Sequence, residues 1–519
     1  MHTKRDTPID QPERSHPALK KSLSKQAIEA LIWGFLDFLA VKVVFFVRIL
    51  VLARLLTPED FGLLAIGLTA IAVLLKLSDF GVVTALIQRP DVSRQDYDAG
   101  WTIGVARASL VTLIVILAAP QIAAFFGDLR ATAIIQVLAI GVILDALASI
   151  KIAGLNRKLQ FRSIAITHLA EATAITVVSI AMASSYGVWA LVAGYLAGSL
   201  SNTVVSYIVA PYRPRLRWHK SAVSELLNYG RWIFLTAVIV MIAQAGLRAI
   251  ISRHLGVAEL GIFFLAARLA YLPYTAIVGV IESVAFPVYA RIQDRAKKAR
   301  ELFRATMLGT ATLLIPTCLL LAALAPGLVE HVLGERWAGT TTVVQILAIS
   351  SPLGLAAHAA VPLLKGLGLP SRVTVYEALN SGLSLTLAWV LVGHFGLPGA
   401  VMALLIAVAV SQPVCIAYTR KLLERPYTGL WQPLLAVTAS SLLGAITAGV
   451  LDNHLPGIAG FLIAACAGAL VTLSLTFTAD RLLRLGLVNT LLSYFPVLSR
   501  FLPVDSGQKM GDVVGNTDK

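Results

Sequence analysis

The sequence predicts an all-α integral membrane protein with about 14 transmembrane helices: two parallel six-helix repeats around a central cavity, and two further C-terminal helices. Three observations predict this class. The 519 residues have a mean hydropathy of +0.79 and only 14% are charged, which leaves too little polar surface for a soluble domain. Apolar runs of about 20 residues, long enough to cross the hydrocarbon core as helices, recur from end to end. Short motifs of the first half also return about 200 residues later.

Fourteen apolar runs are the predicted membrane spans, and the polar segments between them are short. The largest of these segments, near 211–226 and 286–302, are too small for a catalytic domain. The predicted spans, in order, are 28–52, 61–86, 100–125, 131–152, 163–184, 187–210, 227–251, 259–285, 303–325, 340–364, 373–393, 396–418, 432–451 and 456–479.

The basic residues predict the orientation of the chain. The formal net charge is +15, but lysine and arginine lie mainly in and beside the connecting segments, so membrane orientation explains them better than nucleic-acid binding. With the N-terminus inside, 33 of the 43 fall on the inner side and four on the outer side: Arg54, Arg130, Arg253 and Arg336. We therefore expect both termini in the cytoplasm, and we expect no secretory signal peptide in the polar first 25 residues.

The first repeat opens with a clear helix start in the stretch from Ala53 to Arg89. Thr57 is expected to cap a helix whose first turn holds Pro58, Glu59 and Asp60, because proline and acidic residues are favoured there. A related stretch, SRHLGVAELGIF, follows at residues 252–263.

The two stretches belong to an internal repeat. Three positions of the first recur at a constant offset of 199: Arg54, Leu56 and Gly62 match Arg253, Leu255 and Gly261. Residues 134–140 match 343–349 at an offset of 209. Apolar helices can resemble each other through composition alone, but shared glycine, arginine and glutamine positions favour a duplication. Six spans are an even number of crossings, so both copies insert the same way up, with a site between them.

These observations divide the chain into five parts. Residues 1–25 are predicted to be a disordered basic cytoplasmic tail, 26–212 an N-terminal six-helix lobe and 213–425 a C-terminal six-helix lobe. Residues 426–485 hold two appended transmembrane helices, and 486–519 form a cytoplasmic C-terminal tail.

Several motifs carry a resemblance to a known family. RLLTPEDFGLLA (54–65) followed by SDFGVVTALIQR (78–89) closely resembles the Wzx-type polysaccharide and lipopolysaccharide flippases of the multidrug/oligosaccharidyl-lipid/polysaccharide exporter superfamily. Further matching pieces are GVWALVAG (187–194), ARLAYLP (267–273), FPVYARIQD (286–294) and LGERWAG (333–339).

The resemblance implies a function and partners. Such a protein is a flippase that translocates undecaprenyl-pyrophosphate-linked oligosaccharide units from the cytoplasmic to the periplasmic leaflet by alternating access, for exopolysaccharide or lipopolysaccharide assembly. It implies the bacterial inner membrane, contact with membrane lipids, no cofactor, and a polysaccharide polymerase and export machinery as candidate partners. The alternative is a multidrug or small-molecule extruder of the same superfamily, whose cavity would favour unpaired acids and aromatics.

Five cations inside predicted spans 1, 2, 7 and 8 are the candidate substrate-binding residues. A charge at the bilayer centre costs about 2.5–3.5 kcal/mol, so each one needs a reason. If the four helices meet at the repeat axis, their cations would line a cavity suited to an anion, since arginine binds phosphate oxygens in bidentate fashion. Alternatively, Lys42 and Arg48 snorkel towards the interface or pair with Asp37, and Lys76 pairs with Asp79 on its own helix. The five candidates are Arg268, Arg48, Arg248, Lys42 and Lys76.

The two later arginines differ in how far they match the family. Arg268 lies in the matching ARLAYLP motif. Near Arg248 this chain has Gly246 and Leu247, where the family commonly has an aspartate, so no ion or sugar contact is carried over to that place.

Three acids inside spans are candidates for ion or proton coupling: Asp145, Glu171 and Glu282. Hydrogen bonding between helices is the other interpretation of each, and His168 lies close enough to Glu171 on span 5 to pair with it. Pro273 and Pro287 bracket much of span 8, so a bent span 8 is the hinge candidate.

Motifs for catalysis and metal binding are lacking in the sequence. There is no phosphate-binding G-x-x-x-x-G-K-[ST], no G-x-S-x-G and no H-E-x-x-H, and the three cysteines lie singly in apolar runs. Asp96 and Asp98 form a D-x-D in a short loop, where solvation or helix capping explains them better than metal binding. A membrane-bound polysaccharide polymerase or glycosyltransferase would need a larger outer loop than 326–339. We therefore expect no enzyme, no catalytic residue and no metal.

Overall fold

The computed structural model describes residues 17–78, 93–157, 160–215, 227–293 and 295–487, and within these ranges every regular element is a helix. The elements are α1 (Pro17–Leu55), α2 (Pro58–Leu77), α4 (Arg94–Phe126), α5 (Ala131–Ala146), α6 (Ile152–Arg157), α7 (Phe161–Tyr186), α8 (Val188–Val209), α9 (Leu227–Leu255), α10 (Val257–Ala270), α11 (Leu272–Arg291), α12 (Ala296–Gly327), η1 (Leu328–Leu333), η2 (Glu335–Trp337), α13 (Thr340–Leu353), α14 (Leu355–Gly366), α15 (Pro370–Leu422), α16 (Trp431–His454) and α17 (Gly457–Leu483).

The helices confirm the predicted all-α membrane class. Among the described residues, ten helices are long and apolar enough to cross a membrane, or eleven if the α13–α14 pair, bent by 51°, is one span. Three features lower this number. α5, at predicted span 4, has only 16 residues. α15 runs through predicted spans 11 and 12, although Gly396 turns its backbone with φ of 62°. α1 carries three charges, Asp37, Lys42 and Arg48, in its membrane part. The count of fourteen is consistent with this arrangement and stays a prediction.

Two element boundaries differ from the predicted ones. α1 begins at Pro17, so residues 17–25, which the sequence analysis placed in a disordered tail, belong to a helix. The rest of both predicted tails, residues 1–16 and 488–519, lies outside the described residues. Predicted span 8 consists of two helices, because α10 ends at Ala270 and α11 begins at Leu272. The break lies beside Pro273, near the N-terminal side of the predicted hinge region.

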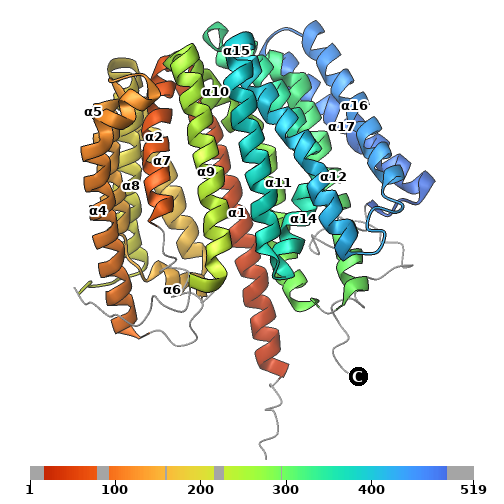
Figure 1. Cartoon of the computed structure of the whole chain (residues 1–519), viewed down its shortest axis with the longest axis horizontal. Coiled ribbons are helices and arrows are strands. Elements are labelled where there is room, and N and C mark those ends of the chain that lie inside the picture. The colour runs from red at the N-terminus through yellow and green to blue at the C-terminus, as the bar shows by residue number, and fades with distance from the viewer. Residues whose placement is uncertain (1–16, 79–92, 158–159, 216–226, 294, 488–519) are drawn as a thin grey trace, which may run out of the picture.

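The helices form two groups with α1, α9 and α10 between them (Figure 1). Helices α2, α4, α5, α7 and α8 stand on one side, helices α11 to α15 on the other, and α16 with α17 forms the far edge against α12. The packing repeats between halves: α1 lies against α7, and α9 lies against α15. We name the end where α1 and α9 stop and α2 and α10 start the upper end, and the opposite end the lower end.

Local sequence explains the helix starts at the upper end. The Thr57 side chain accepts a hydrogen bond from the Asp60 backbone N–H at 3.3 Å, and the Asp60 carboxylate accepts one from the Thr57 N–H at 2.9 Å. This capping box confirms the predicted start of α2, with Pro58 in the first turn.

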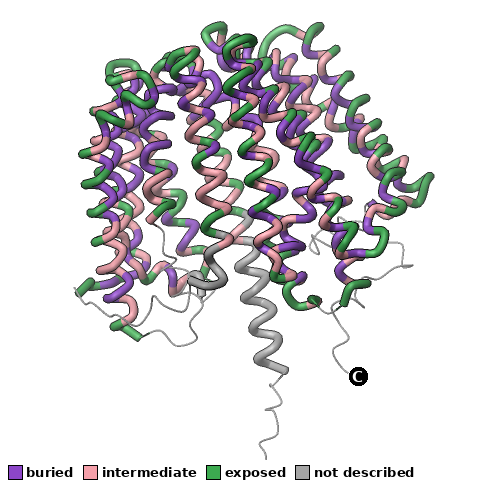
Figure 2. The backbone as a smooth tube through the Cα atoms, viewed as in Figure 1, coloured by how far each residue is buried: buried purple, intermediate pink, exposed green. Residues whose placement is uncertain are grey.

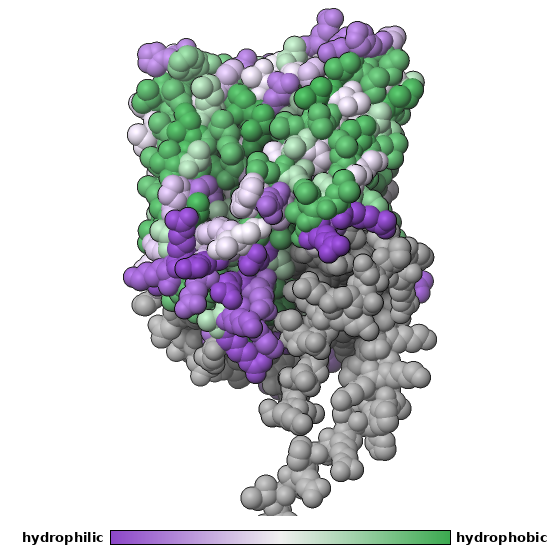
Figure 3. Space-filling view, turned by 90° about the vertical axis from the view of Figure 1, so that its right-hand side faces the viewer, coloured by the Kyte–Doolittle hydropathy of each residue, from purple (hydrophilic) through white to green (hydrophobic). Residues whose placement is uncertain are grey.

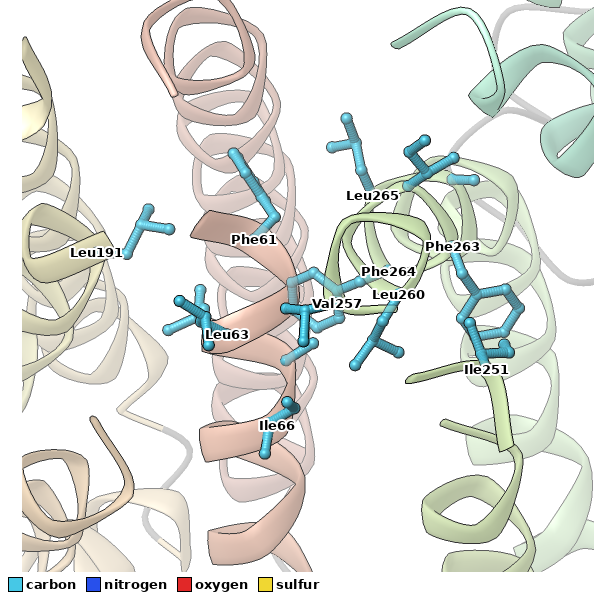
Figure 4. Close-up of a cluster of buried hydrophobic side chains, with 14 of the residues drawn as sticks. Phe61, Leu63, Ile66, Leu191, Ile251, Val257, Leu260, Phe263, Phe264 and Leu265 are labelled. Atoms are coloured by element: carbon cyan, nitrogen blue, oxygen red, sulfur yellow. The ribbon is translucent and has the colours of Figure 1, made fainter. Parts of the chain in front are cut away.

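The largest cluster of buried apolar residues lies towards the upper end and joins both halves (Figure 2), and a second cluster, with Tyr289, Phe303 and Leu363, lies within the second half. Val257 of α10 points towards α2 among Phe61, Leu63 and Ile66 (Figure 4). Outside the core, large apolar side chains stay exposed on many helices, and they form a broad band below the polar upper rim (Figure 3). Such a band is the surface that faces lipid in a multi-pass membrane protein.

Candidate functional site

The two halves meet at the upper end through a symmetric contact between α2 and α10. A Cβ atom added at Gly62 would overlap the carbonyl oxygen of Val257, and one added at Gly261 would overlap that of Pro58. Gly62 and Gly261 are repeat partners at the offset of 199, and so are Pro58 and Val257. The contact is therefore the same on both sides of a pseudo-twofold axis, and only glycine allows the backbones to come this close. We call these four residues the upper contact.

An arginine closes the upper end beside this contact. Arg54, at the end of α1, donates through Nε to the carbonyl oxygen of Val332 at 2.6 Å and through Nη2 to that of His331. Both acceptors lie at the C-terminal end of the π-helix η1, where backbone carbonyls lack a partner inside the helix. The second half has a related arrangement, because Arg253 packs its side chain over Gly127 between α4 and α5.

Trp337 completes the closure. Its indole is fully buried and donates to the carbonyl oxygen of Ala53 at 2.7 Å. Its ring meets the Phe61 ring edge to face, with 5.2 Å between centroids. Because Trp337 belongs to the second half and both partners to the first, this closure joins the lobes.

Below the closure lie three arginines from three helices: Arg48 of α1, Arg248 of α9 and Arg268 of α10. The charge of Arg268 interacts with those of both other arginines. We call these three residues the central arginine cluster. The structure thus brings together three of the five predicted cations, and their contact with a substrate stays a prediction.

The cluster is held by aromatic rings and a hydroxyl group. The Arg268 guanidinium lies 4.4 Å from the Phe264 ring centroid and 5.5 Å from that of Phe45, and the Arg48 guanidinium lies 5.2 Å from the Phe45 centroid. Arg248 donates to the Thr69 hydroxyl at 2.8 Å. Within the described ranges none of the three forms an ion pair at 4 Å or less, and Glu171 is the acid whose charge acts on Arg48. Their positive charge is therefore largely uncompensated.

The two predicted lysines lie elsewhere. Lys42 stacks its ammonium over the Phe38 ring of its own helix at 5.5 Å. Lys76 lines a cavity of about 440 Å³ between α2, α9, α14 and α15. It follows Thr69 by seven residues on α2, which places it about 10 Å nearer the lower end than the Arg248 contact. Asp79, its suggested partner, lies outside the described residues.

The predicted acids fall into two places. Asp145 lies beside Ser199 and Asn202 inside the first half, and its charge acts on Glu171. Glu282 of α11 lies in the second half and forms an ion pair with Lys365 of α14 at 2.8 Å.

One pairing differs from the one that sequence spacing suggested, and one paired cation was not identified from the sequence. Asp37 pairs with His168 of α7 at 2.8 Å, not with Lys42 on its own helix. Lys365 was missed, because it follows the end of predicted span 10 by one residue and therefore counted as a connecting-segment charge. Glu282 could have pointed to Lys365, because an acid inside a predicted span needs a partner such as a cation.

A charged group outside the membrane helices lies at the upper end. Arg130 Nη2 contacts an Asp128 carboxylate oxygen at 2.6 Å and a Glu59 oxygen at 2.7 Å. The hydrogen bond from Arg130 lowers the pKa of Asp128 below its ordinary value.

Comparison of the sequence with known proteins identifies the family, and comparison of the structure identifies the fold. The polysaccharide biosynthesis protein family matches residues 51–342. The chain is 25% identical to the succinoglycan biosynthesis transport protein ExoT of Rhizobium meliloti over 62% of its own length and 66% of that protein. It is 25% identical to the lipopolysaccharide biosynthesis protein WzxC of Escherichia coli over 63% and 67%. The structure of the lipid II flippase MurJ in an inward closed conformation superposes with a TM-score of 0.70, covering 88% of this chain and 99% of that one at 17% identity, and so shares its fold.

Proposed function

The chain belongs to the polysaccharide biosynthesis protein family, and we propose that it is a flippase for undecaprenyl-pyrophosphate-linked oligosaccharide units. The relatives ExoT and WzxC carry names from polysaccharide biosynthesis, and aligned segments cover about two thirds of each. The observation that carries the proposal is the central arginine cluster, which lies between the halves beneath a closed upper end.

The cluster suits a diphosphate. Guanidinium groups bind phosphate oxygens in bidentate fashion, and stacking on Phe45 and Phe264 keeps two of them oriented before a ligand arrives. Three like charges that lie near each other on half-buried side chains repel, so a multivalent anion gains more there than a neutral or cationic molecule would. This supports an anionic lipid-linked glycan over the substrates of a multidrug extruder.

The charge distribution supports an orientation. We place the lower end, where α1 begins and α17 ends, in the cytoplasm of a bacterium, and the protein in its inner membrane, because most basic residues lie in and beside the connecting segments predicted on that side. The upper end, with Arg54, Arg130, Arg253 and Arg336, then faces the periplasm. The described conformation is accordingly closed to the periplasm.

Transport follows from movement of the two lobes. The diphosphate and sugars enter from the cytoplasmic side, the lipid tail stays in the bilayer, and rocking of lobe 26–212 against lobe 213–425 breaks the upper contact for release. No covalent step is needed. As the groups that couple this movement to an ion or proton we propose Glu171 and Asp145, a role supported by the interaction of the Glu171 charge with those of Arg48 and His168. Residues 426–485 stay outside this core, and polymerase and export machinery would receive the product.

The test is genetic complementation with charge-neutral variants. The gene is deleted in its host and restored as wild type, Arg268→Gln, Arg48→Gln or the control Arg213→Gln, whose side chain lies in an exposed loop. Surface polysaccharide and lipid-linked intermediates on the cytoplasmic face are measured at equal membrane abundance. We expect the two cluster variants to lose polymer and trap intermediates, while Arg213→Gln restores both. Unchanged polymer after complete deletion would refute the flippase assignment. If deletion of the gene abolishes polymer but Arg268→Gln and Arg48→Gln both restore it, the flippase assignment stands and the central arginine cluster is refuted as the substrate site.

A further inference from the structure

A second group of cations, a pair of lysines, lies nearer the lower end than the central arginine cluster. Lys76 of α2 and Lys365 of α14 line the same cavity of about 440 Å³. The rest of the lining is mainly apolar, with Val240 and Met241 of α9 and Val373 of α15 among its members. A cavity with two ammonium groups and apolar walls fits a ligand that is itself charged at one point and apolar beside it.

The two lysines come from different halves of the repeat. Lys76 lies on the second helix of the first lobe, whereas Lys365 lies at the lower end of the bent α13–α14 span of the second. An anion bound to both would therefore bridge the lobes. Since bridging attracts the two lower ends towards each other, the ligand would favour closure on the side from which it entered.

Lys365 already has an exchangeable partner. Its ammonium pairs with Glu282 at 2.8 Å, and the side chains keep 31% and 36% of their exposed area. Glu377 also interacts with its charge. Lys76 is exposed and forms no ion pair within the ranges that the structure describes. An incoming anion can thus take the place of Glu282 on Lys365 while meeting Lys76 directly, without stripping a fully buried pair.

We propose that Lys76 and Lys365 form an inner anion subsite that receives the diphosphate of the lipid-linked substrate before it reaches the central arginine cluster. The proposal rests on the proposed function. Glu282 acts in it as a competitor: it neutralises Lys365 while the subsite is empty and is displaced by the ligand. The apolar lining beside the lysines would contact only the part of the lipid chain next to the diphosphate, while the rest of the chain stays in the bilayer.

If Glu282 competes with the ligand for Lys365, substitution of the two residues should change ligand binding in opposite directions. The full chain is reconstituted in nanodiscs of phosphatidylcholine, and equilibrium binding of radiolabelled polyprenyl diphosphate is measured. Lys365→Gln and Lys76→Gln should each weaken binding about tenfold, through loss of a charge-assisted hydrogen bond. Glu282→Gln should tighten binding several-fold, because it removes the carboxylate that forms an ion pair with Lys365. The control Lys297→Gln, at the exposed start of α12, should stay within twofold of wild type.

Further measurements separate the proposed subsite from misfolding of a variant, from a phospholipid site and from the proposed function. The double variant Glu282→Gln/Lys365→Gln removes both charges of the ion pair, and it should bind as weakly as Lys365→Gln. Inorganic pyrophosphate should compete in the wild type and lose this effect in Lys365→Gln. Weaker or unchanged binding in Glu282→Gln, or wild-type binding in Lys365→Gln, overturns the proposal. Competition by phosphatidylglycerol and not by pyrophosphate also overturns it, in favour of a phospholipid site. If Arg268→Gln weakens binding while the lysine variants do not, the inner subsite fails and the proposed function stands.

Discussion

The upper contact makes a quantitative prediction about the conformational equilibrium. Replacing Gly261 by alanine adds a Cβ atom that overlaps the Pro58 carbonyl oxygen. That oxygen belongs to the backbone of a capped helix start, so only separation of α2 and α10 relieves the overlap. Overpacking of this kind costs about 1–3 kcal/mol. Since the cost falls only on the closed conformation, the ratio of closed to open molecules should fall about 5- to 150-fold.

The helix itself does not explain such a shift. Alanine stabilises a helix interior by about 1 kcal/mol relative to glycine, but the proposed movement rocks the lobes as rigid bodies and leaves α10 helical, so this gain cancels. Gly279→Ala on α11 is the matched control, because no neighbouring heavy atom outside the helix backbone lies within 4 Å of its added Cβ. Gly62→Ala, the repeat partner, should act like Gly261→Ala, through overlap with Val257.

Spin-label distances across the upper end measure the shift. Labels at exposed Leu129 and Glu335 report the separation of the two lobes, in a chain whose exposed Cys466 is replaced by serine. We expect a longer distance to dominate in Gly261→Ala and Gly62→Ala and to stay minor in Gly279→Ala. Equal distance distributions in all three variants and the wild type would refute the reasoning that this contact closes the upper end.

Three further predictions follow from the same structure. Trp337→Phe removes the indole hydrogen bond to Ala53 but keeps a ring in place. It should therefore favour the open conformation by about 1 kcal/mol, which increases the population with the longer spin-label distance. Unchanged distances would contradict this role. Arg268→Gln should raise the thermal unfolding midpoint by about 2 °C while transport is lost, because it relieves repulsion among the arginines; a lowered midpoint would show that the residue is structural. Asp128→Asn should destabilise by about 0.5 kcal/mol at pH 7. The pKa of Asp128 is lowered by Arg130, so its stabilisation is present above the ordinary carboxyl pKa and is lost as the pH falls through the lowered value. The difference between variant and wild type in thermal unfolding should shrink towards pH 3, and a constant difference would refute the charge argument.

Several features followed from the sequence alone, because each depends on residues close together in the chain. Apolar runs of spanning length predicted a helical membrane protein, and the Thr57–Asp60 pattern predicted a helix start that has both bonds of a capping box. The repeat offset of 199 identified Gly62 and Gly261 as equivalent. Charge on four helices predicted a cationic region, and three of the five named residues do come together.

The tertiary structure decided which of those residues meet. Spacing along one helix suggested that Asp37 pairs with Lys42, yet the partner is His168, 131 residues away. Lys76 separates from the arginines and shares a cavity with Lys365, which spacing had placed in a connecting segment. Periodicity determines which face of a helix a side chain occupies, but not how that helix is rotated against its neighbours. Partners of a buried charge are therefore set by the packing of helices distant in the chain, which one sequence leaves open.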